Sequence, residues 1–257
     1  MLHTTHTVVE SVASAHTYSF RDIYTRLQDL GYLPVTPAFI HEQHDMKYIA
    51  FFKWPVPKML QEAADRYPWN PYNPFFRGAV IQFERYNGIL HHTGMSEGRL
   101  HAQVIKVLMS SSARPDPVPW QWVIVSKSRP ESLHVWQRNK HTGKWVWHTV
   151  VNTGVMHSTP SGTWPIYQRL PVTTMIGEFP YYEGGTVHWQ HYDDPGIKWV
   201  NYFDAGRGIH YYPRASYGFP QSAGCVEEPL STAEHTYDIL HYGVPVTVTS
   251  QPFSYTY

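Results

Sequence analysis

The stretch GIHYYPRASYGFPQSAGCVEEP, residues 208–229, decides how the rest of the chain is interpreted, because it contains the single cysteine of the sequence. His210 precedes Cys225 in this stretch, and Ser222 and Gly224 stand just before the thiol. A glycine before a nucleophile lets the backbone turn tightly, so that amide N–H groups can point at an oxyanion. An imidazole near a thiol favours the reactive thiolate. The stretch therefore predicts Cys225 as a nucleophile and His210 as its base, the alternative being a buried structural thiol.

The composition excludes several classes of protein. The chain has 257 residues, 42% of them hydrophobic, which is enough to bury a sizeable core. Its 20 Lys and Arg balance its 20 Asp and Glu, so we expect no nucleic acid partner. A single cysteine excludes an intramolecular disulfide and any metal site built on paired thiolates. No run is long and apolar enough for a membrane span, and residues 1–20 show no export signal.

Around this stretch, in the carboxy-terminal half, apolar and polar residues alternate with a period of two. Runs rich in Val and Trp, such as WQWVIVS, KWVWHTV and VPVTVTS, predict strands separated by turn residues. One helix is expected between the cysteine and the last strand, with a capping box of Ser231 and Glu234. Residues 120–257 are therefore predicted to be a mostly antiparallel β domain with one late helix.

The amino-terminal half has a helical period instead. Residues 1–18 are polar and predict a flexible leader. Ser19 is expected to cap a first helix that ends near Gly31. Apolar spacing then predicts two further helices and, between the first and second of them, an aromatic, proline-rich insertion that contains one more helix. We expect a small three-helix bundle over 19–110, built from helices at 19–30, 77–86 and 100–108, with the insertion at 35–76 and its own helix at 57–67.

Between the halves, residues 111–119 combine small residues with three prolines, which predicts a linker without regular structure. The fold class is therefore α+β, with a helical domain, a linker and a β-rich domain in that order. We expect the part of the chain from about Pro115 onward to fold by itself.

The β-rich half resembles the L,D-transpeptidase catalytic domain. That family carries a His, a spacer, and then Ser-x-Gly-Cys followed by an aliphatic residue, which here are His210, Ser222, Gly224, Cys225 and Val226. A strand leading into Thr-Pro-x-Gly also matches, as does a closing Gly-x-Pro-Val-x-Val strand; these are residues 151–163 and 243–248. The resemblance implies a β-rich catalytic fold and a Cys acyl-enzyme that needs no cofactor.

A second resemblance, to peptidoglycan-binding three-helix domains, covers the amino-terminal half. The matching features are a Leu-Gly-Tyr-Leu helix end at 30–33, a central helix with Ala, Phe and Glu at 79–84, and a short third helix at 100–108. The resemblance implies a wall-binding module beside the catalytic domain. The insertion at 35–76 is longer than the loop such domains carry.

Three positions depart from the catalytic pattern. Ala223 stands where many members have His, Tyr211 where many have Gly, and Glu227 where many have Arg or Asn. The absence of a second motif His makes His210 the one motif base. A carboxylate at Glu227 is expected to change how an anionic stem peptide is held, with Arg214 taking over part of that role.

The remaining site residues carry open alternatives. Arg214 and Tyr217 lie between His and Cys, so they are either substrate-binding or structural. Ser222 either orients His210 or completes the turn. The 17 histidines raise a metal hypothesis, with HEQHD at 41–45 and HWQH at 188–191 as its best clusters. Neither has the spacing of a helical zinc site with a general base, so we expect no metal.

The resemblance implies that Cys225 attacks a stem-peptide amide, that D-alanine leaves, and that the thioester passes to an amine or to water. The partners it implies are peptidoglycan stem peptides and glycan strands, and the location is secreted or cell-wall associated. A monomer is expected. Trimming by an L,D-carboxypeptidase, a non-catalytic peptidoglycan-binding protein and a cysteine hydrolase of ordinary peptides remain alternatives. The order His before Cys is opposite to that of papain-like enzymes and argues against the last.

Overall fold

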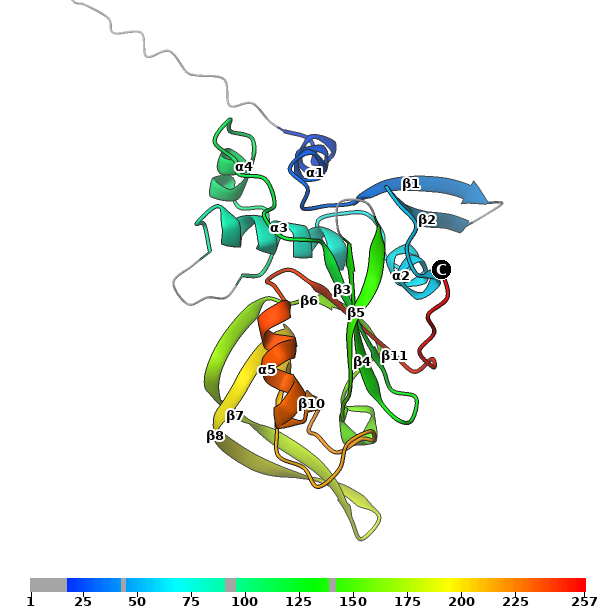
Figure 1. Cartoon of the computed structure of the whole chain (residues 1–257), viewed down its shortest axis with the longest axis vertical. Helices are drawn as coiled ribbons and strands as arrows, with labels where there is room; N and C mark the ends of the chain where they lie inside the picture. The colour runs from blue at the N-terminus through cyan, green and yellow to red at the C-terminus, as the bar shows by residue number, and fades with distance from the viewer. Residues whose placement is uncertain (1–17, 43–44, 91–95, 139–141) are drawn as a thin grey trace, which may run out of the picture.

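The computed structural model describes residues 18–42, 45–90, 96–138 and 142–257, and the side chains of 37–48 are outside the description. The predicted leader, 1–18, therefore lies almost wholly outside the described residues, as do the side chains of the HEQHD cluster. No helix in the described ranges is long and apolar enough to cross a membrane. Figure 1 shows the amino-terminal elements packed on one end of a β-rich body.

A five-stranded sheet forms the centre of that body. Its strand order is β5-β4-β3-β11-β6, and β3 and β11 pair in parallel while their outer neighbours pair antiparallel. The first strand and the last strand of the domain are thus brought side by side in its middle. The strands are β3 (Gln121–Ser126), β4 (Ser132–Arg138), β5 (Gly143–Val150), β6 (Gly162–Pro165) and β11 (Pro245–Thr249).

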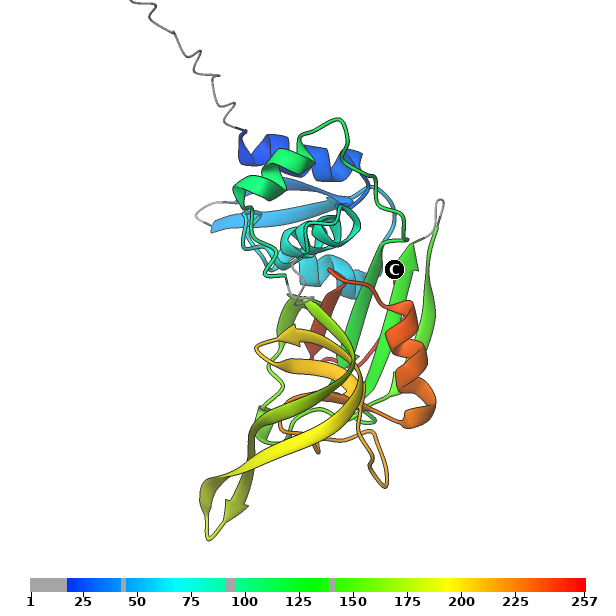
Figure 2. The ribbon, with the colours of Figure 1, turned by 90° about the vertical axis from the view of Figure 1, so that its left-hand side faces the viewer.

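A second, four-stranded sheet has the order β10-β9-β8-β7. Its longest strands, β7 (Gln168–Glu183) and β8 (Thr186–Asp204), form a hairpin that extends well beyond the body in Figure 2. β9 (Arg207–Tyr211) pairs antiparallel with β8 and parallel with β10 (Val226–Glu228). The predicted late helix, α5 (Leu230–Ile239), contacts β8 and β9.

The capping box predicted for this helix is wrong. Pro229 is the N-cap residue and no side chain caps the helix. The fixed φ of proline suits the start of a helix, and the helix starts two residues before the start that a Ser231 cap would give.

Strand β3 is buried along its whole length because both of its faces are covered. Val123 and Val125 face a core shared with the four-stranded sheet, which includes Ile209 and Val226. Trp122 and Ile124 point the other way, as alternation along a strand requires, and join the core of the amino-terminal half. One face of the central sheet therefore belongs to the core of the amino-terminal half, and the other face belongs to a separate core within the β domain.

The amino-terminal half is not a bundle of three helices alone. The three predicted helices exist, and Ser19 caps the first as predicted, in a capping box with Asp22 that the sequence had not indicated. The insertion contains its predicted helix and also an antiparallel hairpin that the sequence analysis missed, because its strands are broken by a proline and an irregular apolar pattern. The elements are α1 (Phe20–Asp29), β1 (Val35–Glu42), β2 (Asp45–Phe52), α2 (Lys58–Asp65), α3 (Pro74–Tyr86) and α4 (Ala102–Leu108).

The predicted linker has no helix or strand, yet it is held against the helical half. The amide of Asp116 donates to the carbonyl of Leu30 at 2.8 Å, and its carboxylate accepts from Gln82 at 3.0 Å. Close packing also joins α3 to the β domain: a Cβ on Gly78 would lie 2.3 Å from the carbonyl oxygen of Gly243. The two halves are thus fixed together at several points.

Candidate active site

His210 and Cys225 are brought together by the parallel pairing of β9 with β10. His210 is opposite Glu227 in this pairing, and Cys225 directly precedes the first residue of β10. His210 and Cys225 are fifteen positions apart in the sequence, and the loop between the two strands brings them together. The imidazole is 2% exposed, while the cysteine is partly exposed.

The turn before Cys225 is closed by the Ser222 hydroxyl. Its oxygen donates to the carbonyl of Cys225 at 2.6 Å and accepts from the amide of Gly224 at 3.0 Å. Both contacts lie within the turn, which corresponds to the turn-completing alternative for this serine. Gly224 has φ +144°, a conformation that favours glycine, and its amide is already used by Ser222.

The Thr-Pro-x-Gly segment holds this turn from the other side. The Thr159 hydroxyl donates to the carbonyl of Gly224 at 2.8 Å and accepts from the amide of Gly154 at 2.7 Å. Isolated bridges pair Gly154 with Ser222 and Asn152 with Glu227. The two motifs that are far apart in the sequence thus form one hydrogen-bonded unit around the cysteine.

One tautomer of His210 follows from its hydrogen bond. Nδ1 lies 2.9 Å from the carbonyl oxygen of Tyr211, which only accepts, so Nδ1 carries the proton. Nε2 is buried and has no oxygen or nitrogen partner among the described residues. Burial lowers the pKa of His210, but the neighbouring Cys225 sulfur, the Tyr211 carbonyl and the Glu227 charge outweigh it and raise this pKa. The imidazolium is therefore stabilised beside the thiol.

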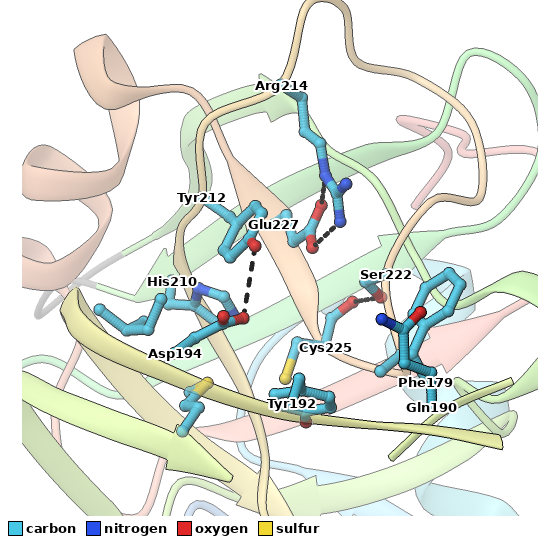
Figure 3. A pocket seen from close by; sticks show the side chains of 13 residues that line it. Phe179, Gln190, Tyr192, Asp194, His210, Tyr212, Arg214, Ser222, Cys225 and Glu227 are labelled. Carbon is cyan, nitrogen blue, oxygen red and sulfur yellow. Dashed lines mark hydrogen bonds and ion pairs between the residues drawn. The ribbon is translucent and has the colours of Figure 1, made fainter. Parts of the chain in front are cut away.

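A pocket of about 290 Å³ opens on Cys225. Figure 3 shows His210 and Cys225 in its lining, together with side chains of β8 such as Tyr192 and Asp194. The sequence analysis predicted none of the hairpin residues. A signal was present, since two long runs flank Gly184-Gly185, a pair typical of a two-residue hairpin turn. The hairpin contributes Met175, Phe179, Gln190, Tyr192, Asp194 and Ile197.

Arg214 and Glu227, both in the pocket lining, are paired with each other. Arg214 Nε donates to Glu227 Oε2 and Nη2 donates to Oε1, each at 2.8 Å. Arg214 also lies over the ring of Tyr212. Tyr217 is not among the residues that line the pocket; its hydroxyl donates to the carbonyl of Tyr212 at 2.6 Å and thereby supports the loop.

A second carboxyl group lies behind the site. Glu228 is fully buried and accepts a hydrogen bond from the Thr236 hydroxyl on α5 at 2.6 Å. Burial raises the pKa of Glu228 to about 8, although the bond from Thr236 and the charge of His210 both lower it. Burial therefore favours the neutral form of this carboxyl group, and the carboxylate that raises the pKa of His210 is that of Glu227.

No group of three or more His, Cys, Asp or Glu that could hold a metal ion occurs within the described ranges. His188 and His191 of the HWQH cluster alternate with each other on β8, so their side chains leave opposite faces of the strand. The lining of the Cys225 pocket contains a thiol, an imidazole, a guanidinium group and the carboxylates of Asp194 and Glu227.

Comparisons with known proteins agree with this arrangement. The family model for the L,D-transpeptidase catalytic domain (YkuD) matches residues 121–248. The match does not extend to the amino-terminal half. No curated protein matches the chain.

Solved structures show a distant likeness. An L,D-transpeptidase from Mycobacterium smegmatis is 18% identical, with a TM-score of 0.39 over 50% of this chain and 59% of that one. An L,D-transpeptidase from Stackebrandtia nassauensis is 19% identical, with a TM-score of 0.34 over 68% and 78%. The catalytic domain of an E. faecium L,D-transpeptidase is 21% identical, with a TM-score of 0.39 over 52% and 99%. This chain thus spans less than two thirds of the mycobacterial chain.

Proposed function

Residues 121–248 form an L,D-transpeptidase catalytic domain, and on this premise we propose that the chain crosslinks peptidoglycan stem peptides through an acyl-enzyme on Cys225. The observation that carries the proposal is the shared pocket: His210 and Cys225 line one cavity, and the imidazole keeps an unpartnered Nε2 there. A thiol beside such an imidazole is the arrangement of a cysteine nucleophile with its base.

In the acylation step, Cys225 gives its proton to Nε2 of His210, and the thiolate attacks the carbonyl carbon of a stem-peptide amide. The C–S bond forms, the C–N bond breaks, and the leaving amine takes the proton from the imidazolium. The products are a thioester, neutral His210 and a free amino acid, D-alanine in the substrate implied by the family. Since Ser222 uses the amide of Gly224, we propose the amide of Cys225 as a donor to the oxyanion.

In the second step, a primary amine of another stem attacks the thioester. The C–N bond forms and the C–S bond breaks, while the amine nitrogen gives one of its two protons to His210 and keeps the other in the new amide. The imidazolium then returns this proton to the thiolate, which restores the thiol and the neutral His210 of the first step. Attack by water instead gives a carboxylic acid and trims the stem, which is the L,D-carboxypeptidase alternative. Both outcomes use the same acyl-enzyme. We further propose that the protein acts outside the cytoplasm, where its substrate is.

The test is the intact mass of the full chain after incubation with a carbapenem. The strained β-lactam amide resembles the acyl-donor bond, so an activated thiolate is expected to open the ring and leave one adduct of the full carbapenem mass. Cys225→Ser should form no adduct, because a hydroxyl is far less ionised than a thiol at neutral pH. His210→Ala should form the adduct at least tenfold more slowly.

A wild-type chain that stays unmodified would reject the enzyme proposal and favour the non-catalytic binding protein. An adduct on the Cys225→Ser chain would place the nucleophile elsewhere. Circular dichroism of each variant shows whether a missing adduct reflects lost chemistry or lost folding. The assignment of residues 19–110 as a peptidoglycan-binding module stays a prediction.

A further inference from the structure

The charges that line the Cys225 pocket do not balance. Arg214 and Glu227 neutralise one another through their two 2.8 Å hydrogen bonds. His210 and Cys225 share one proton between imidazole and thiol, so together they carry no net charge whichever of them holds it. Asp194 is left over: among the described residues it has no ion-pair partner, and its one hydrogen bond comes from the neutral hydroxyl of Tyr212 at 3.3 Å.

Asp194 lines the same pocket as the nucleophile because of the alternation of β8. Tyr192 and Asp194 are two residues apart on this strand, so both side chains leave the same face, and both line the pocket. After burial, the charges of Cys225 and then Asp194 are the largest causes that raise the pKa of Tyr192. The charges of Cys225 and Asp194 thus both raise the pKa of the same residue, Tyr192.

The pocket also offers no unpaired cation to a substrate carboxylate. The guanidinium of Arg214 is occupied by a buried partner, since Glu227 is 3% exposed. A carboxylate placed in the pocket would meet Asp194 as a like charge in a partly buried site, where repulsion is less screened than in water. A primary ammonium would be attracted to the same carboxylate and to the aromatic rings beside it.

We propose that Asp194, flanked by Tyr192 and Tyr212, is an ammonium-binding subsite that holds the amine of the acceptor stem beside the Cys225 thioester. The subsite rests on the proposed function for its role in the reaction. The bound ammonium gives one proton to the neutral His210 left by acylation, attacks the thioester carbon as an amine, and loses its second proton to solvent. The subsite makes aminolysis compete with hydrolysis, since water gains nothing from Asp194.

Direct binding tests the subsite without relying on catalysis. The full chain carrying Cys225→Ser is titrated with Nα-acetyl-lysine amide, a primary ammonium without a carboxylate, and binding is followed by calorimetry or by NMR shifts. We expect saturable binding that weakens at least tenfold in the added variant Asp194→Asn, which keeps the size and the hydrogen bond from Tyr212. Nα,Nε-diacetyl-lysine amide, which has no charge, should bind at least tenfold more weakly than the amine.

Asp193→Asn is the matched control. Asp193 is the exposed neighbour of Asp194 and its side chain leaves the opposite face of β8, so this change should leave binding of the amine within twofold. The subsite is overturned if the Asp194→Asn chain binds the amine as tightly as the chain that keeps Asp194. It is also overturned if Asp193→Asn weakens binding to a similar extent, or if no saturable binding is seen. None of these results depends on carbapenem acylation, which tests the function separately.

Discussion

Arg214 and Glu227 form a two-point ion pair in the wall of the Cys225 pocket, with both N–O distances at 2.8 Å. Glu227 is one of the three residues that depart from the family pattern, and Arg214 is the residue that the sequence predicted to take over part of its role. The side chain of Arg214 is 27% exposed, whereas that of Glu227 is 4% exposed. Loss of Arg214 would therefore leave a buried carboxylate, whereas loss of Glu227 would leave a guanidinium group that water can reach.

Arg214→Ala is expected to destabilise the fold by about 3 kcal/mol, because it leaves a buried carboxylate without its counter-charge. Glu227→Gln should cost less, about 1 kcal/mol, since water reaches the remaining guanidinium. The double variant Arg214→Met with Glu227→Gln should recover most of the loss. Urea unfolding of the full chain measures all three, and equal costs for both single changes would contradict the asymmetry.

Gly224→Ala should distort the turn that carries Cys225. The added Cβ would lie 2.9 Å from the carbonyl oxygen of Ser158 at a φ of +144°, and such backbone strain costs about 1–3 kcal/mol. We expect carbapenem acylation to slow at least tenfold. Gly185→Ala is the control, because Gly185 also has a positive φ, of +79°, but open space around its Cβ. If both variants acylate at the wild-type rate, the turn does not position the nucleophile.

The free energy of unfolding should decrease as the pH rises, because Asp116 loses its proton. Burial raises the pKa of Asp116 to about 7 from an ordinary value of 3.8. The folded state therefore holds the proton more tightly, and its stability falls as the pH rises from about 4 to about 7 and then levels off. Asp116→Asn should flatten this part of the profile and be the more stable chain at pH 8. Thermal unfolding between pH 4 and 8 measures this dependence of stability on pH. If the Asp193→Asn and Asp116→Asn chains depend on pH in the same way, Asp116 is not its cause.

A chain that starts at Pro115 should fold poorly, in contrast to the expectation from sequence. Without the amino-terminal half, Trp122, Ile124 and Trp136 lose their cover, and each stabilises the fold by about 1.5–3 kcal/mol when fully buried. We expect aggregation, or unfolding at a lower urea concentration than the full chain requires. Unchanged stability and a reactive thiol in the shortened chain would show that the β domain is autonomous.

The turn before Cys225 could be predicted from the sequence because the interactions that form it are local. A glycine at φ +144°, a serine closing the turn and a cysteine after it occupy four consecutive positions, and His210 is on the neighbouring strand. The hairpin β1–β2 and the pocket wall from β7–β8 were missed. Their roles depend on which strand lies beside which, and a period of two does not encode that choice.

The sequence by itself determined the Ser-x-Gly-Cys turn, the helix capped by Ser19 and the period-two strands of the β domain, since propensity and short-range hydrogen bonds act within a few residues. Only the tertiary structure decided that Arg214 pairs with Glu227, that Asp194 lines the same pocket as the cysteine, and that β3 is covered on both faces. These contacts join residues far apart in the chain, and their free energy depends on strand order and packing rather than on any local pattern.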